Sequence, residues 1–195
     1  MTTSHPLPPL SPLCVYCGSA DGNRPDYPLA AAAMGTAIAK AGITLIYGGG
    51  RKGLMGHVAQ GALDHGGHVI GIITQQLVDM ETAHTGLRDL RIVATMHERK
   101  MIMASESRAF IALPGGVGTL DELFEILAWS QLGLHHSPIG LLNVAGFFDA
   151  LITVIERMQQ EGFLRLKPER VLAIDADPAR LLAKMAALTS DSLGA

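Results

Sequence analysis

The chain has 195 residues, of which 48% are hydrophobic and 17% charged, and its net charge is -3. This length fits one domain with a sizeable core, and the acidic balance without a lysine or arginine cluster argues against nucleic acid as the main partner. No apolar run is long and uninterrupted enough to span a bilayer, so we expect no membrane partner, and the mean hydropathy of +0.28 favours a homo-oligomer.

The first dozen residues contain four prolines and lack the basic segment followed by an apolar one that opens a signal peptide. This composition predicts a disordered N-terminal tail over residues 1–12. We expect a single domain over residues 13–190, in a cytoplasmic protein.

Short apolar runs bounded by glycine follow this tail and alternate with segments of helical period. Runs of valine, isoleucine and leucine of this length are typical of strands that are buried on both faces of a parallel sheet. The predicted strands are Leu13–Tyr16, Ile43–Tyr47, His68–Ile73, Arg91–Ala94, Ala109–Leu113, Ile139–Asn143 and Val171–Ile174.

Helix-period segments lie between most of these strands and after the last one. The predicted helices are Tyr27–Ala41, Leu54–His65, His97–Ser107, Leu120–Leu132, Phe148–Glu161 and Pro178–Leu188. The repeated β-α order indicates a Rossmann-like, doubly wound parallel sheet in a three-layer α/β/α fold. In such sheets the ligand binds beyond the carboxyl ends of the strands.

Cys14 and Cys17 form a C-x-x-C pair, which is a redox motif when it opens a helix. Here Cys14 falls inside a predicted strand, where a helix N-terminus does not stabilise its thiolate. A second pair of ligands at zinc spacing is missing, so we predict two reduced core residues and no metal site.

Three glycine-rich turns follow predicted strands, at residues 17–19, 48–53 and 115–118. One such turn is often only tight packing, but three at one edge of a sheet favour a ligand. A dinucleotide is excluded because no acidic ribose anchor follows the first two turns, and the G-x-x-x-x-G-K-[ST] loop for nucleoside triphosphates is absent. A mononucleotide or another small phosphate ester remains.

The third turn belongs to the most informative stretch, Leu113–Glu122, which reads LPGGVGTLDE. Its glycines let the backbone approach a ligand, and a helix that starts near Thr119 offers free N–H groups and the positive end of its dipole to a phosphate. We therefore predict a phosphate cradle with a carboxylate behind it.

A second informative segment is Met96–Lys100, which begins a predicted helix and places two adjacent cations, Arg99 and Lys100, near its start. Cations at this end of a helix oppose its dipole unless an anion is bound nearby. The alternative interpretation is a solvated, charged first turn in which Glu98 compensates the cations.

Five segments together resemble the LOG (Lonely Guy) family of cytokinin riboside 5'-monophosphate phosphoribohydrolases. They are Y-C-G-S at 16–19, Y-G-G-G at 47–50, G-L-M-G at 53–56, M-H-E-R-K at 96–100 and P-G-G-V-G-T-L-D-E at 114–122. Members of this family are often labelled lysine decarboxylases. Pyridoxal phosphate chemistry needs a Schiff-base lysine in a much larger apparatus, so we expect no cofactor.

The resemblance implies hydrolysis of the N-glycosidic bond of a nucleoside 5'-monophosphate to free base and ribose 5-phosphate, by a homodimer. It implies that Glu122 stabilises an oxocarbenium-like transition state or activates water, and that Arg99 orients this glutamate and the ribose hydroxyls. The implied substrate and phosphate contacts are Gly18, Ser19, Gly49, Gly50, Met55, Glu81, Lys100, Pro114, Gly115, Gly116, Val117, Gly118 and Thr119.

Two other functions remain open at this point. A non-catalytic nucleotide or molybdenum-cofactor carrier shares the fold and the P-G-G-x-G-T loop, although it has less need of Arg99 paired with Glu122. A general AMP nucleosidase would use the same residues. The physiological base also remains open, as does the effect on specificity of Leu127, which stands where some relatives have a threonine that contacts ligand. The effect of Arg51-Lys52, which replaces the small or polar residues common after the triple glycine in plant relatives, is open as well.

Overall fold

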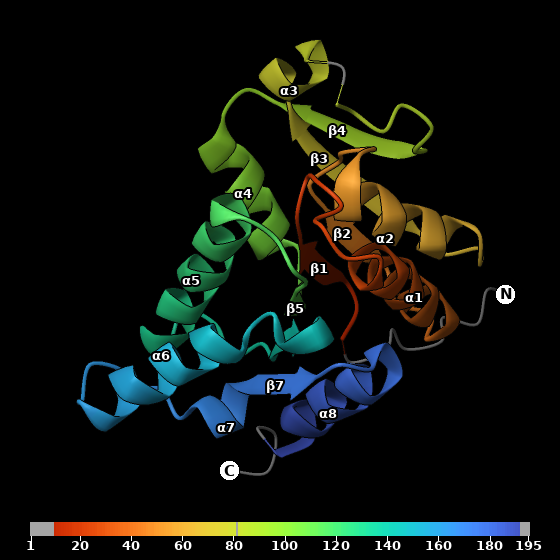
Figure 1. Cartoon of the computed structure of the whole chain (residues 1–195). Coiled ribbons are helices and arrows are strands. Elements are labelled where there is room, and N and C mark those ends of the chain that lie inside the picture. The colour runs from red at the N-terminus through yellow and green to blue at the C-terminus, as the bar shows by residue number, and fades with distance from the viewer. Residues whose placement is uncertain (1–9, 81, 192–195) are drawn as a thin grey trace, which may run out of the picture.

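The computed structural model describes residues 10–80 and 82–191 (Figure 1). Within these residues one seven-stranded parallel sheet forms, in the order β4-β3-β2-β1-β5-β6-β7. After β1 the chain adds β2, β3 and β4 on one side of the sheet and then β5, β6 and β7 on the other, so the strand order reverses at β1. The strands are β1 (Leu13–Tyr16), β2 (Leu45–Tyr47), β3 (Val69–Thr74), β4 (Asp89–Val93), β5 (Ala109–Ala112), β6 (Ile139–Leu142) and β7 (Leu172–Asp175).

Helices cover both faces of the sheet (Figure 1). The first face packs on α1 (Asp26–Lys40), α2 (Gly53–Leu63) and α8 (Pro178–Asp191). The opposite face packs on α4 (Met96–Ser105), α5 (Val117–Gln131) and α6 (Asp149–Gln160). Two short helices, α3 (Gln75–Asp79) and α7 (Pro168–Val171), and a 3-10 turn at Val144–Gly146 complete the described elements. The predicted three-layer, doubly wound α/β fold is confirmed.

Alternation along β1 shows why the strands read as continuous apolar runs. Leu13 and Val15 pack into the core under α1 and α2, whereas Cys14 and Tyr16 pack into the core under α4 and α5. Successive side chains of a strand point to opposite faces, so a sheet covered on both faces needs apolar residues at every position. Cys14 and Cys17 are free and buried, as predicted, and burial raises the pKa of both thiols.

Most predicted element ends lie within two residues of the observed ones, and the larger differences have physical causes. Helix α5 begins at Val117 rather than Leu120, because Gly116 takes an extended backbone conformation and serves as its N-cap. The short helices α3 and α7 were not predicted, since five or four residues show no helical period.

Residues 1–9 of the predicted N-terminal tail lie outside the described residues, and the residues that follow pack against the fold. Leu10 is 3% exposed and Ser11 is fully buried, so the fold extends upstream of the expected boundary at Leu13. The hydroxyl of Ser11 accepts a hydrogen bond from the backbone N–H of Thr44 at 3.1 Å.

In the described part of the chain, no helix combines the length and the apolar character needed to cross a membrane.

Candidate active site

Three turns meet at the carboxyl edge of the sheet, where the strand order reverses. β1 pairs with both β2 and β5, so the segments that leave these strands lie side by side. The N–H of Gly18 donates to Pro114 O at 3.0 Å, and the N–H of Met55 donates to Gly18 O at 3.3 Å. These bonds join the turns after β1 and β5 to the start of α2. Ligands of doubly wound sheets bind at this switch point.

A cavity of about 480 Å³ opens between the three turns. Its volume lies in the range of roughly 300–1,000 Å³ that is usual for small-molecule sites. Ten of the predicted site residues line it: Gly18, Ser19, Gly50, Met55, Arg99, Gly116, Val117, Gly118, Thr119 and Glu122. The sequence motifs therefore converge on one site.

One end of the cavity is formed by the start of α5. Leu120 N–H donates to Gly116 O at 3.2 Å, which leaves the N–H groups of Val117, Gly118 and Thr119 ahead of the first helical hydrogen bond. Such groups and the helix dipole bind phosphate. A side chain at Gly115 would meet the Thr119 side chain and would lie 2.8 Å from the Gly18 nitrogen, so this glycine permits the turns to pack closely.

The helix that carries Arg99 is fixed by its own N-terminal residues. Thr95 Oγ1 accepts a hydrogen bond from the N–H of Glu98 at 3.1 Å, and Glu98 Oε2 accepts one from the N–H of Ala94 at 2.9 Å. These contacts resemble a capping box, in which side chains at the first turn satisfy free backbone donors. Glu98 thus caps α4. Arg99 is 8% exposed, so the alternative interpretation of a solvated first turn is wrong for this residue.

The guanidinium of Arg99 is held by backbone carbonyl groups of two strand ends. Its Nε donates to Ile72 O at 3.0 Å, and Nη2 donates to Gly48 O at 3.4 Å. A Cβ atom at Gly48 would overlap Nη2 of Arg99 and lie 3.0 Å from Met55 Sδ. Only glycine at position 48 therefore leaves room for this orientation of Arg99.

Glu122 faces Arg99 across the cavity from α5, with Oε1 3.9 Å from Arg99 Nη1. The Glu122 side chain is 12% exposed. Burial raises the pKa of Glu122 from 4.5 to about 7, and the nearby Arg99 charge only partly opposes this rise. A buried carboxyl group that titrates near neutral pH in a cavity beside a fixed cation is typical of a catalytic site.

Lys100 lies elsewhere, although it follows Arg99 directly. Its ammonium group is 3.1 Å from Asp121 Oδ2 and 3.1 Å from Glu125 Oε1, so it joins α4 to α5. Gly49 also falls outside the lining of the cavity; it has a positive φ of 70°, and its carbonyl accepts the N–H of His84. Neither residue lines the cavity, and their contact with a ligand stays a prediction.

Pro114 and Gly115 line a smaller adjacent cavity of about 270 Å³, which shares Gly18, Ser19 and Gly116 with the main one.

Glu81, which the resemblance implies as a substrate contact, lies outside the described residues. Within residues 10–80 and 82–191, no group of three or more histidine, cysteine, aspartate or glutamate side chains is placed to hold a metal ion.

The structure adds an apolar wall that the motifs did not indicate. Apart from Gly48 and Thr82, the lining residues that were not predicted are apolar: Val15, Cys17, Ile73, Leu77, Met80 and Met103. Leu77 belongs to α3 and Met80 follows it directly, so the unpredicted short helix supplies part of the wall. In the sequence these residues are indistinguishable from core residues, and only their shared position reveals the wall.

Comparison with known proteins shows the family of this chain. Residues 55–185 match the family described as "Possible lysine decarboxylase". Cytokinin riboside 5'-monophosphate phosphoribohydrolase LOG1 of Arabidopsis thaliana is 44% identical over 172 residues, which cover 88% of this chain and 80% of that protein. Probable cytokinin riboside 5'-monophosphate phosphoribohydrolase LOGL3 of Oryza sativa subsp. japonica is 45% identical over 172 residues, covering 88% of this chain and 82% of the relative. This chain belongs to the LOG family.

Solved structures share the fold of this LOG-family chain at lower identity. The Moco carrier protein of Chlamydomonas reinhardtii has a TM-score of 0.69 and 21% identity, over 93% of this chain and 99% of that one. The molybdenum cofactor binding protein of Rippkaea orientalis has a TM-score of 0.66 and 22% identity, over 94% of this chain and 98% of that one. At this identity the likeness shows a common fold and carries no activity across.

Proposed function

We propose that this LOG-family chain hydrolyses the N-glycosidic bond of N6-substituted adenosine 5'-monophosphates and releases the free base and ribose 5-phosphate. The observation that carries the proposal is the buried pair of Arg99 and Glu122, which faces the amide groups at the start of α5 within one cavity. Phosphoribohydrolase relatives at 43–46% identity support the same reaction. A carrier protein needs the phosphate cradle but does not need a buried carboxyl group beside it.

In the proposed mechanism the 5'-phosphate binds the N–H groups of Val117, Gly118 and Thr119, which places the ribose ring toward Glu122. The carboxylate of Glu122 stabilises positive charge at C1′ or takes a proton from the attacking water. The water oxygen bonds to C1′ as the C1′–N bond breaks, and the base nitrogen receives the electron pair and a proton. Arg99 fixes the carboxylate and the ribose hydroxyls.

The apolar wall supports a substituted base. Leu77, Met80 and Met103 line the same cavity as the phosphate cradle, and unbranched methionine side chains adapt to irregular apolar groups. An isopentenyl group on N6 buries apolar surface there, at about 25 cal/mol per Å² removed from water. We therefore expect a preference for the N6-substituted nucleotide over AMP.

The raised pKa of Glu122 predicts the pH dependence of the reaction. Burial favours the neutral acid, whereas the mechanism needs the carboxylate, so kcat/KM is expected to rise with pH until the group is ionised above about 7. Because kcat/KM reports ionisations of the free enzyme, initial rates between about pH 5 and 9 at low substrate measure this group. A rate that falls as pH rises through 7 would assign catalysis to the protonated acid and contradict the mechanism.

The close packing at Gly48 makes a second prediction. Gly48→Ala is expected to lower kcat/KM by about 10²-fold, because its methyl group displaces Arg99 and a shift near 1 Å in a catalytic group has an effect of that order. Gly86→Ala is the matched control, since the added Cβ would lie no closer than 3.5 Å to its neighbours. Equal rates for both variants would show that the position of Arg99 does not limit the reaction.

We also propose that the protein is a homodimer that acts in the cytoplasm, where free thiols such as Cys14 and Cys17 stay reduced. The support for a dimer is apolar surface on α4 and α5: Met101 is 51% exposed and Phe124 is 38% exposed. Exposed apolar patches of this kind mark interaction sites.

Light scattering at micromolar concentration is expected to give twice the chain mass of 20.6 kDa. The double variant Met101→Asp/Phe124→Asp is expected to be monomeric, because it places charges in the interface. Phe163→Asp, at a residue that is 78% exposed beyond α6, is expected to stay dimeric. A monomeric wild-type protein would refute the proposal.

A further inference from the structure

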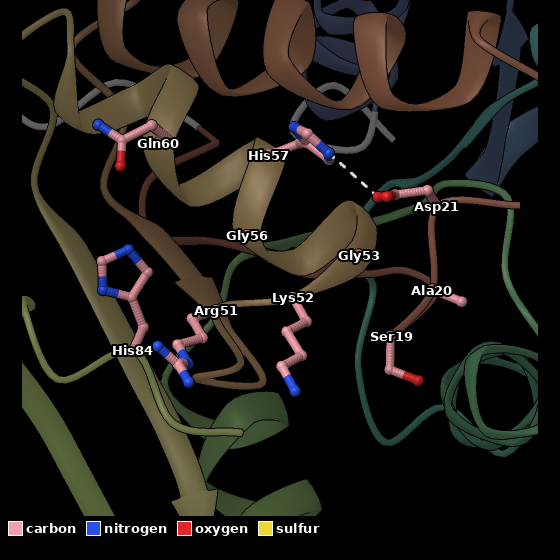
Figure 2. Close-up of a pocket in the computed structure, with 10 residues that line it drawn as sticks. All are labelled: Ser19, Ala20, Asp21, Arg51, Lys52, Gly53, Gly56, His57, Gln60 and His84. Carbon is pink, nitrogen blue, oxygen red and sulfur yellow. Dashed lines mark hydrogen bonds and ion pairs between the residues drawn. The ribbon is translucent and has the colours of Figure 1, made fainter. Parts of the chain in front are cut away.

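Two lysines close to the catalytic cavity differ in what surrounds them. Lys52, the N-cap of α2, is exposed and borders a separate basin (Figure 2). Lys100 lies on α4, and its side chain is only 15% exposed. Its ammonium group lies between two carboxylates of α5, at 3.1 Å from Asp121 Oδ2 and 3.1 Å from Glu125 Oε1. Lys100 therefore joins the two helices that carry the catalytic pair.

The two carboxylates that contact Lys100 are unequal partners. The side chain of Asp121 is 60% exposed, whereas that of Glu125 is 28% exposed. Solvent weakens an exposed ion pair, and a partly buried pair is screened less. The contact with Glu125 is therefore the stronger link to α5, and it lies one helical turn beyond Glu122.

The catalytic pair is anchored from one side. Arg99 directly precedes Lys100, and its guanidinium donates to Ile72 O at 3.0 Å and to Gly48 O at 3.4 Å at the ends of two strands. Among the described residues, the polar contact of the Glu122 carboxylate is its 3.9 Å approach to Arg99 Nη1. The placement of α5 against α4 therefore sets the distance between the carboxylate and the guanidinium.

Lys100 also compensates negative charge around Glu122. Burial raises the pKa of Glu122 to about 7, and the charges on the two helices adjust this value. Asp121 and Glu125 raise the pKa further, whereas Arg99 and Lys100 lower it. Without the lysine, the two neighbouring acids of α5 would lose the cation that lies between them.

The groups that face Glu122 from β1 and the turn after it are neutral. Cys14, Tyr16 and Cys17 interact with the Glu122 charge, and burial raises the pKa of all three groups well above the neutral range. The charges that act on Glu122 near neutral pH are thus those of α4 and α5.

From this geometry we propose that Lys100 is a positioning residue, whose contact with Glu125 holds α5 against α4 and thereby sets the distance between Arg99 and Glu122. The inference rests on the proposed hydrolysis, in which Arg99 and Glu122 act together. Lys100 lies outside the described lining of the cavity, so this role differs from the substrate contact that the family resemblance implies.

Initial rates of base release by the full chain, measured at low substrate between about pH 5 and 9, test this role. Lys100→Met and Glu125→Gln are each expected to lower the limiting kcat/KM at high pH by about 10- to 100-fold, because a small displacement of a catalytic group has an effect of that order. The double variant is expected to lose no more than either single one, since each substitution already breaks the contact. Lys100→Arg, which keeps a cation between the helices, is expected to restore most of the rate.

The two substitutions separate position from charge. Loss of the Lys100 charge alone would raise the pKa of Glu122, and loss of the Glu125 charge alone would lower it. A purely electrostatic role would therefore move the two pH profiles in opposite directions and leave the limiting kcat/KM at high pH unchanged, which would overturn the proposal. A raised KM in Lys100→Met that adds to the effect of Glu125→Gln would also overturn it, because it would indicate direct contact with the substrate.

Lys184→Met is the matched control for loss of a lysine between two elements. Lys184 pairs with Asp175 at 2.9 Å and joins α8 to β7, so this variant is expected to keep the wild-type rates and pH profile. Thermal unfolding confirms that each variant is folded.

Crystal structures of the wild type and of Lys100→Met give a measurement that does not depend on activity. The distance from Arg99 Nη1 to Glu122 Oε1 is expected to be longer in the variant than in the wild type. An unchanged distance would overturn the positioning role, whereas a wild-type protein that released no base would refute the proposed hydrolysis and leave this comparison to decide the role of Lys100.

Discussion

Replacing Glu122 by glutamine is expected to lower kcat for base release by about 10²- to 10⁴-fold, the range usual for the loss of a general acid or base. Glutamine keeps the shape of the side chain but cannot carry the negative charge that the mechanism places near C1′. The substitution should not unfold the protein, because it removes a buried carboxyl group that burial already disfavours in its charged form. Single-turnover measurements with saturating enzyme isolate the chemical step.

Asp121→Asn is the matched control on the same helix. Asp121 has a side chain that is 60% exposed, and Lys100 keeps its contact with Glu125 when Asp121 is changed. This variant is expected to retain kcat within about twofold, as surface charge pairs contribute little. Comparable losses in both variants would indicate a general effect of charge on α5, and full activity in Glu122→Gln would remove the carboxylate from the mechanism.

The second large effect is expected at Arg99. Arg99→Met is expected to reduce kcat/KM by about 10²-fold or more, because it removes the cation that orients Glu122 and the ribose hydroxyls. It also removes the charge that lowers the pKa of Glu122, so the rise of kcat/KM with pH should move above its wild-type position near 7. A displacement of the pH profile separates this effect from a loss of folded protein.

Arg99→Lys is expected to restore the charge but little of the rate. The contacts of Arg99 with Ile72 O and Gly48 O use Nε and Nη2 of one planar group, and a lysine ammonium cannot reproduce that fork. Arg157→Met, at a residue that is 71% exposed on α6, serves as the control for loss of an arginine. Wild-type kinetics in Arg99→Lys would show that charge alone is sufficient.

The strands and the main helices were predictable because local pattern and burial agree along most of the chain. Strands such as β1 must be apolar at every position when both faces are covered, and this pattern is visible in the sequence. The glycine-rich turns after β1, β2 and β5 predicted a ligand site at the carboxyl edge of the sheet, because parallel strands all end at that edge.

Contacts between residues that are far apart in the chain were harder to predict from the sequence. The neighbours Arg99 and Lys100 look alike in the chain, yet one is buried against Gly48 and the other pairs with acids on α5. Their separation depends on the rotation of α4 against its neighbours, which the Thr95 and Glu98 caps help to fix. The apolar wall from α3 was missed because a five-residue helix leaves no periodic signal.

The most direct test of the central claim is base release from isopentenyladenosine 5'-monophosphate and from AMP, measured side by side with quantification of ribose 5-phosphate. We expect equal amounts of base and ribose 5-phosphate, a higher kcat/KM for the isopentenyl nucleotide and almost no release by Glu122→Gln. A higher kcat/KM for AMP would instead identify a general AMP nucleosidase. Tight binding of both nucleotides without any release of base would contradict the account and indicate a carrier.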